Sequence, residues 1–218
     1  MKNKFSTQEI MALVIMLVPS VYLGIVYGQL PATIPTNFGI HGPDAYGHKS
    51  QSWVMVVILT LVSLLVFGIL KYLPFIDPKK TAAASPGLLK KMAVIIVIFM
   101  SFLQVVLINA MKGNLFSLER LLLPVMSIFF CFLGNLMLNI KPNYFVGFRL
   151  PWTLENEENW RKTHRLGGKL WFFAGILSAV LTSLFPFQYS IVIFLIILFI
   201  ISIIPIFYSY SFFKSHRQ

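Results

Sequence analysis

Long apolar runs alternate with short polar segments along the whole chain. Six runs are long enough to cross a bilayer, which takes about 20 apolar residues per helix: residues 10–27, 53–73, 92–111, 121–138, 168–187 and 190–210. Because lipid offers no partner for backbone N–H and C=O groups, each run must be helical. The last two runs are nearly contiguous and predict a tight helical hairpin. The pattern predicts an all-α integral membrane protein whose residues 1–218 form a single domain.

The composition supports a lipid-embedded chain. Of its 218 residues, 57% are hydrophobic and only 11% are charged, whereas soluble domains carry about 25% charged residues. We interpret the first run as a retained anchor, because it is longer than a usual signal region and no small-residue cleavage site follows it. The one cysteine, Cys131, lies in the fourth run and is expected to act as a small hydrophobe.

The basic residues are distributed unevenly about the six runs. Fifteen of the 18 Lys and Arg residues fall on one side, and only Lys49, Lys112 and Arg120 fall on the other. The positive-inside rule then predicts that both termini are cytoplasmic. This explains the net charge of +11 without nucleic-acid binding. The basic rim should instead attract the anionic headgroups of membrane lipids.

The polar segments outside the runs differ in character. Residues 29–50, predicted to be extracellular, are rich in Pro and Gly and should form turns and extended chain. There His41, Asp44 and His48 are interrupted by Gly42 and Pro43, so a solvated turn is favoured over a metal site. Residues 74–91 are predicted to form a cytoplasmic basic linker, and residues 112–120 a short external turn.

The densest polar segment is "RLPWTLENEENWRKTHRLGG", residues 149–168, within a cytoplasmic segment at 140–168. It predicts a short cytoplasmic helix between membrane helices 4 and 5. Thr153 or Asn156 would cap its start, early acids and late bases would match the helix macrodipole, and Gly167 with Gly168 would end it. Two acid–base pairs stand four residues apart, a spacing that stabilises a helix: Glu157 with Arg161, and Glu158 with Lys162.

Two interpretations of this short helix remain open. It could lie on the inner leaflet with Trp152 and Trp160 at headgroup level. Its three acids would weaken that attraction, which favours a docking surface for other loops or a soluble partner. Arg149 could bind a lipid phosphate or cap carbonyls at the end of the fourth span. Glu157 and His164, seven residues apart, are too few ligands for a closed metal site.

Polar residues inside the runs suggest helix packing more than transport or catalysis. Buried amides usually join helices, and "GIVYG" at residues 24–28 is a weak signal for close packing. No ionisable residue lies near the centre of a run, which counts against an ion-coupled pump. We find no nucleophile elbow, phosphate-binding loop or zinc-protease motif, so we expect no enzyme, cofactor or metal site. The amides in question are Gln104, Asn109, Asn135 and Asn139.

The segment "VGFRLPWTLENEENWRKTHRLGGKLW", residues 146–171, resembles the signature of the SdpI family of bacterial membrane proteins. The matching residues are Gly147, Arg149, Pro151, Trp152, Thr153, Leu154, Glu157, Trp160, Lys162, Thr163, His164 and Arg165. Residues 30–50 are similar to a segment of unassigned role that often heads this family. The fit there is at Pro31, Ile34, Pro35, Phe38, Tyr46 and Gly47, with Asn37 where the family pattern often has His.

The resemblance implies a multi-pass immunity protein of the bacterial cell membrane. Such a protein would confer resistance to a secreted toxin peptide and could hold a cytoplasmic winged-helix repressor at the membrane. The implied cytoplasmic partner-binding residues are Arg149, Pro151, Trp152, Glu157, Trp160, Lys162, Thr163, His164 and Arg165. The implied residues of the extracellular loop are Pro35, Asn37, Phe38, Tyr46 and Gly47. The alternatives are a transporter or lipid-handling protein gated by the polar helix and, third, a membrane enzyme.

Overall fold

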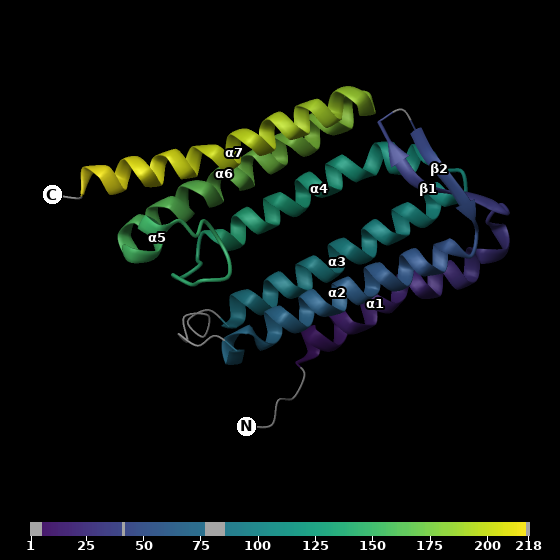
Figure 1. The fold of residues 1–218 in the computed structure, drawn as a ribbon, viewed down its shortest axis with the longest axis horizontal. Coiled ribbons are helices and arrows are strands. Elements are labelled where there is room, and N and C mark those ends of the chain that lie inside the picture. The colour runs from purple at the N-terminus through teal and green to yellow at the C-terminus, as the bar shows by residue number, and fades with distance from the viewer. Residues whose placement is uncertain (1–5, 41, 77–85, 217–218) are drawn as a thin grey trace.

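The computed structural model describes residues 6–40, 42–76 and 86–216. Figure 1 shows long helices lying side by side, with a small hairpin across one end and both termini at the other. The elements, in chain order, are α1 (Thr7–Val26), the 3-10 helix η1 (Tyr27–Gln29), β1 (Thr33–Gly39), β2 (Gly42–His48), α2 (Gln51–Ile76), α3 (Pro86–Met111), α4 (Leu115–Met137), α5 (Pro151–Glu155), α6 (Glu157–Leu184) and α7 (Phe187–Ser215).

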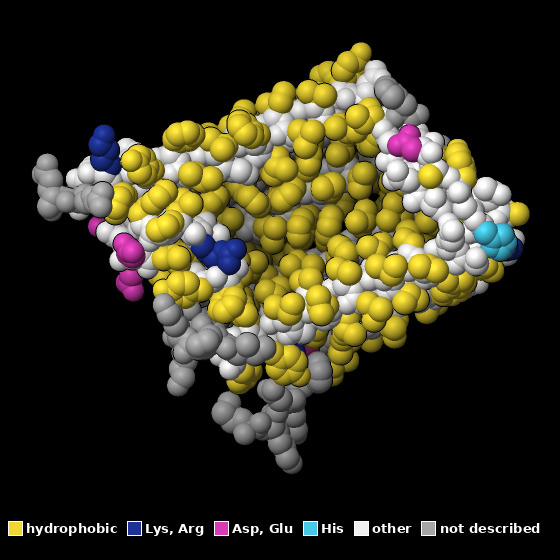
Figure 2. Space-filling view, viewed as in Figure 1, with side chains coloured by type: hydrophobic (Ala, Val, Ile, Leu, Met, Phe, Trp, Pro, Cys, Tyr) yellow, Lys and Arg dark blue, Asp and Glu magenta, His cyan; other side chains and the backbone are white. Residues whose placement is uncertain are grey.

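Within the described residues, six helices are long and apolar enough to cross a membrane, and α5 is the short helix between the fourth and fifth of them. The predicted all-α membrane architecture is therefore confirmed. Figure 2 shows apolar side chains along the length of the molecule and charged ones near its ends. Side chains such as Ile25, Phe173 and Phe207 point outward from the bundle. So large an apolar surface suits lipid and not water.

The helices form two groups of three. In the first, α1, α2 and α3 pack together, and in the second α4, α6 and α7 do so, while α3 packs against α4 between the groups. The α6–α7 connection consists of Phe185 and Pro186, which confirms the tight hairpin. The predicted linker at 74–91 falls partly outside the described residues, because residues 77–85 are not described.

Polar side chains join the helices of the first group. Thr60 of α2 donates a hydrogen bond to Gln104 of α3 at 3.3 Å, and the Tyr22 hydroxyl of α1 donates to Asn109 Oδ1 of α3 at 2.9 Å. The joining role predicted for these two amides is confirmed. Asn135 and Asn139, in contrast, are exposed. Hydrogen bonds of this kind hold transmembrane helices together at a modest gain of about 0.6 kcal/mol each.

An ion cluster ties the same three helices together at the end where the termini lie. Ser6 and Glu9 form a capping box at the start of α1. The Glu9 carboxylate also lies 3.3 Å from Lys71 of α2 and 3.7 Å from Lys90 of α3. Glu9 is buried, so it needs these partners. The sequence "STQE" contains the spacing of a capping box, but the two lysines come from distant parts of the chain.

Glycines bring α4 and α6 into close contact in the second group. A Cβ added to Gly168 would lie 2.8 Å from the carbonyl oxygen of Gly134, and one added to Gly175 would lie 2.8 Å from that of Ser127. The prediction that Gly167 and Gly168 end a helix is wrong, since α6 runs through both to Leu184. The lack of a side chain at Gly168 serves the packing of α6 on α4, and that at Gly167 leaves room for the Phe148 ring of the loop.

The segment predicted as turns and extended chain forms a two-stranded antiparallel hairpin. Strands β1 and β2 pair from Thr33↔His48 to Gly39↔Gly42, with irregular register around Asn37. No helix other than η1 interrupts the described part of residues 29–50. Phe38 packs against Val106, Ala110 and Leu118, so the hairpin is anchored on α3 and α4.

Candidate functional site

The candidate site is the signature segment, and the loop that follows α4 forms its base. The buried Asn143 folds this loop around its own side chain. Its Oδ1 accepts hydrogen bonds from the backbone N–H groups of Phe145 (2.9 Å) and Val146 (2.7 Å), and its Nδ2 donates to the Lys141 carbonyl at 2.9 Å. An amide can satisfy a tight turn in this way because it offers both donors and an acceptor. Asn143 was not among the predicted site residues.

His164 of α6 fixes the same loop from the other side. Its Nε2 accepts a hydrogen bond from the Phe148 N–H at 2.9 Å, and its Nδ1 lies 2.8 Å from the Trp160 carbonyl oxygen. An N–H only donates and a carbonyl only accepts, so both bonds form only with a neutral imidazole that carries its proton on Nδ1. Both ring nitrogens are thereby engaged, so the metal role considered with Glu157 has no support in this geometry.

Trp160, Asn159 and Thr163 pin the first turns of α6 to the rest of the second group. Trp160 is 1% exposed. Its Nε1 donates a hydrogen bond of 2.9 Å to the carbonyl oxygen of Ile140, which follows α4 in the chain. Thr163 donates to Asn159 Oδ1, and Asn159 Nδ2 donates to the carbonyl of Ser209 in α7. The interpretation that placed Trp160 at the headgroup level is therefore wrong. Trp160, Thr163 and His164 all lie in the interior.

The short helix α5 is held by Thr153 and Trp152. The buried Thr153 hydroxyl accepts from the Leu150 N–H at 3.0 Å and lies 2.8 Å from the Phe148 carbonyl. Trp152 Nε1 donates to Ser209 Oγ at 3.0 Å, and its ring packs edge-on against Tyr210. Of the two predicted caps, Asn156 caps α6, accepting from the Asn159 N–H, and Thr153 braces α5.

The exposed residues of the predicted partner-binding set lie in the loop before α5, on α5 and in the first turns of α6. They are Arg149, Pro151, Glu157 and Arg165, with Lys162 half-buried beside them. Lys162 pairs with Glu158 at 2.9 Å as predicted. The ion pairs found among the described residues do not include the predicted Glu157–Arg161 pair. Arg149 Nη1 donates to the Tyr144 carbonyl at 2.8 Å, so it braces the loop and not the end of α4.

Gly147 is the residue of this loop that tolerates a side chain least, and Gly147→Ala is expected to destabilise the protein by about 2–5 kcal/mol, through left-handed backbone strain together with overpacking. Its φ is +105°, and an added Cβ would meet the His164 imidazole. The matched control is Gly113→Ala, where φ is +95° but no atom lies within 4 Å of the added Cβ. Thermal unfolding in detergent should show a clearly larger loss for Gly147→Ala. Equal losses of stability in the two variants would mean that the His164 side chain moves aside and accommodates the added methyl group.

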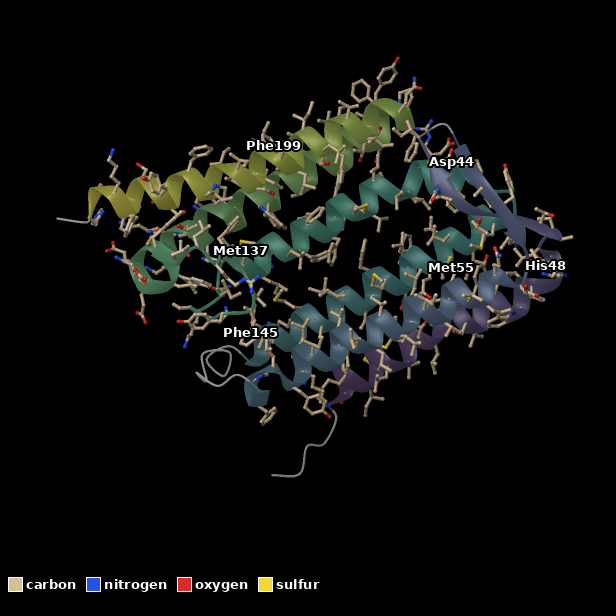
Figure 3. All side chains as sticks on the ribbon, viewed as in Figure 1. Asp44, His48, Met55, Met137, Phe145 and Phe199 are labelled. Atoms are coloured by element: carbon tan, nitrogen blue, oxygen red, sulfur yellow. The ribbon has the colours of Figure 1, made fainter. Side chains whose placement is uncertain are left out.

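The predicted residues of the hairpin are split between its interior and its surface. Pro35 is buried and Phe38 half-buried, whereas Asn37 and Tyr46 are exposed, with Tyr46 at 62%. Gly47 leaves room for the Gln51 side chain at the start of α2. In Figure 3, Asp44 and His48 lie at different places on the hairpin. His41 lies outside the described residues, so the trio weighed as a metal site is not tested.

Comparisons with known proteins match both ends of this architecture. The SdpI/YfhL protein family model matches residues 139–209, from the signature loop to α7, and a domain of unknown function matches residues 14–60, from α1 to α2. The immunity protein SdpI of Bacillus subtilis (strain 168) is 26% identical over 190 residues, which cover 87% of this chain and 88% of that protein. No solved structure matches. The resemblance of this chain to the SdpI family is therefore confirmed.

Proposed function

We propose that this chain is a membrane immunity protein that protects the cell carrying it from a secreted antimicrobial toxin peptide. The observation that supports this most is the likeness to an immunity protein over 87% of the chain. The six spans of the fold agree with an action at the membrane. The buried hydrogen bonds of the signature give it a stable shape that a partner could recognise.

The proposed orientation places both termini and the signature in the cytoplasm and the hairpin outside. Its support is the charge asymmetry, with 15 of 18 basic residues on the side of the termini. Figure 1 has the hairpin at the end of the bundle away from both termini. A toxin arriving from outside would then meet β1 and β2 first. Labelling of single cysteines placed at Tyr46 and Arg165 from outside intact cells should modify only the first.

A growth competition tests the immunity function. Cells that lack this chain should be killed when they are mixed with the toxin-secreting parent strain, and a plasmid copy of the chain should restore their survival. The control is a plasmid copy with a stop codon placed after the first helix. Equal survival of deletion and parent cells in the mixture would contradict the proposal.

We expect Tyr46→Ala to lower toxin resistance severalfold without changing the amount of protein in the membrane. Tyr46 is a large, highly exposed aromatic side chain on β2, the kind of residue that dominates binding interfaces. The matched control is Ile40→Ala, since Ile40 is also well exposed at the tip of the hairpin. The measurement is the survival of cells at graded toxin doses. Unchanged survival of the Tyr46 variant would exclude Tyr46 from toxin contact.

The second part of the proposal is a signalling role at the cytoplasmic end. The exposed charges Glu157 and Arg165 would form the docking surface for a winged-helix repressor, while the buried Trp160, Thr163 and His164 would shape that surface without touching the partner. Arg165→Glu should abolish toxin-dependent retention of the repressor in membrane pellets and leave toxin resistance intact. Lys214→Glu, at the same end on α7, is the control. Retention by the Arg165 variant would contradict this surface.

A further inference from the structure

An apolar cavity of about 230 Å³ lies directly under the signature loop. It is bordered by α3, α4, α6 and the loop after α4, and its lining side chains are uncharged. Figure 2 shows basic side chains near the end of the molecule where the termini lie. The lining side chains of the cavity include Met92, Leu136, Ile140, Val146, Phe148 and Trp171.

The roof of this cavity is held in place by buried polar side chains. Asn143 accepts hydrogen bonds from two N–H groups of the loop, including that of Val146, and His164 accepts from that of Phe148. Both side chains are buried. The shape of the cavity is therefore fixed before any ligand enters, which lowers the cost of binding.

Exposed basic residues stand next in the chain to cavity residues on three different segments. Lys91 precedes Met92 in α3, Lys141 follows Ile140, and Arg149 follows Phe148. Arg149 donates one of its N–H groups to the Tyr144 carbonyl, which holds the guanidinium close to the loop. A guanidinium carries five N–H donors in a planar fork that matches phosphate. Arg149, next to Phe148 of the cavity wall, is thus suited to an anion, and the interior of the cavity to hydrocarbon.

We propose that this site binds one anionic phospholipid, with part of one acyl chain in the cavity and the phosphate on Arg149. The volume of about 230 Å³ is too small for one turn of a peptide helix, which is about 10 Å wide and 5.4 Å long. An acyl chain is narrow enough and is present throughout the membrane. This lipid site does not depend on the proposed immunity function.

A neighbouring groove at the same end serves as an internal comparison. It is lined by Glu157, Glu158 and Arg161 as well as Lys141. Two carboxylates beside the bases make it a poor site for a phosphate, because like charges repel. A lipid that bound through charge alone would not distinguish Arg149 from Arg161, whereas the proposed site depends on Arg149.

Native mass spectrometry of the full chain, released from bilayer nanodiscs, tests the site. With phosphatidylglycerol in the bilayer, the wild type should retain one phosphatidylglycerol molecule, and with phosphatidylcholine alone it should retain none. Arg149→Gln should lower this retention at least about tenfold, as expected when a hydrogen-bonded charge pair is lost. Arg161→Gln is the matched control and should retain lipid like the wild type.

A second variant tests the cavity separately from the charge. Leu136→Trp should fill the hollow and lower phosphatidylglycerol retention with Arg149 still present. Thermal unfolding in detergent shows whether the Leu136→Trp protein is folded. If it is not folded, the test rests on Arg149→Gln, which changes an exposed side chain. Equal retention by wild type and Arg149→Gln, or equal retention of phosphatidylcholine and phosphatidylglycerol, would overturn the proposal.

Discussion

Replacing Gly134 with valine is expected to abolish the folded protein or to cost at least about 3 kcal/mol, because overpacking at a helix contact cannot relax when the obstacle is backbone. A Cβ at this position would lie 2.6 Å from the Phe172 backbone nitrogen and 2.8 Å from the Gly168 carbonyl oxygen. Helices α4 and α6 would have to separate, and the hydrogen bond between Ser127 and Ser178 at 2.8 Å would break. The measurement is the folded fraction after detergent extraction, followed by gel filtration and thermal unfolding.

The chain offers a matched control for this substitution. Gly68 lies inside α2, and no atom stands within 4 Å of an added Cβ there. Gly68→Val therefore tests the effect of a valine within a membrane helix without the clash, and it should be nearly neutral. If both variants unfold alike, the loss does not come from the contact between α4 and α6.

Trp160→Ala is the second substitution expected to have a large effect. It removes the indole, which is 1% exposed and stacks on His164 with 3.9 Å between ring centres, and it leaves the Ile140 carbonyl without its donor. Truncating a buried Trp costs about 3–5 kcal/mol. His164 also loses its neighbour, so the loop at Phe148 should loosen. Thermal unfolding and limited proteolysis of the loop after α4 measure the two effects.

Two further variants separate packing from hydrogen bonding at Trp160. Trp160→Phe keeps most of the ring and removes the Nε1 donor, so it should cost about 1–3 kcal/mol for the carbonyl left unpaired. Trp53→Ala provides the control for indole loss, because Trp53 is 36% exposed on α2. An effect of Trp53→Ala as large as that of Trp160→Ala would contradict a specific role for the buried indole.

The six membrane helices could be predicted because the signal for them is local. A run of apolar residues long enough to span the bilayer has no other stable state in lipid. The pairing of Gln104 and Asn109 with other helices follows from a similar argument, since amides inside a span usually join helices, although Asn135 in α4 is exposed. The Glu158–Lys162 pair was predictable from its spacing alone.

The glycines could not be interpreted from the sequence because their role depends on which helices meet. "GIVYG" has the spacing of a close-packing motif, yet an added Cβ at Gly24 would have no neighbour nearer than 3.9 Å, and one at Gly28 none within 4 Å. The close contacts are made by Gly134 on α4 and by Gly168 and Gly175 on α6, two helices that the signature loop separates in the chain. Helix α6 passes through this contact and continues to Leu184, although the sequence predicted a helix end at Gly167 and Gly168.

The burial of Trp160, Thr163 and His164 was also beyond the sequence. Their spacing gives one face of a helix, but whether that face meets lipid, a partner or the protein's own loop depends on where the chain after α4 goes. The hydrogen bonds that the Asn143 side chain accepts from the backbone of Phe145 and Val146 fix the path of this loop. A single asparagine in a polar loop gives no such indication when the sequence is taken alone.

The division into two groups of three helices has a consequence for how related chains can diverge. The groups meet through α3 and α4 and under Phe38 of the hairpin. A substitution deep within either group needs compensating substitutions only in that group. A substitution at the contact between α3 and α4 needs a compensating substitution on the other helix, as at the stacked rings of Phe99 and Phe129. The group that carries the hairpin and the group that carries the signature could then diverge independently of each other among related chains.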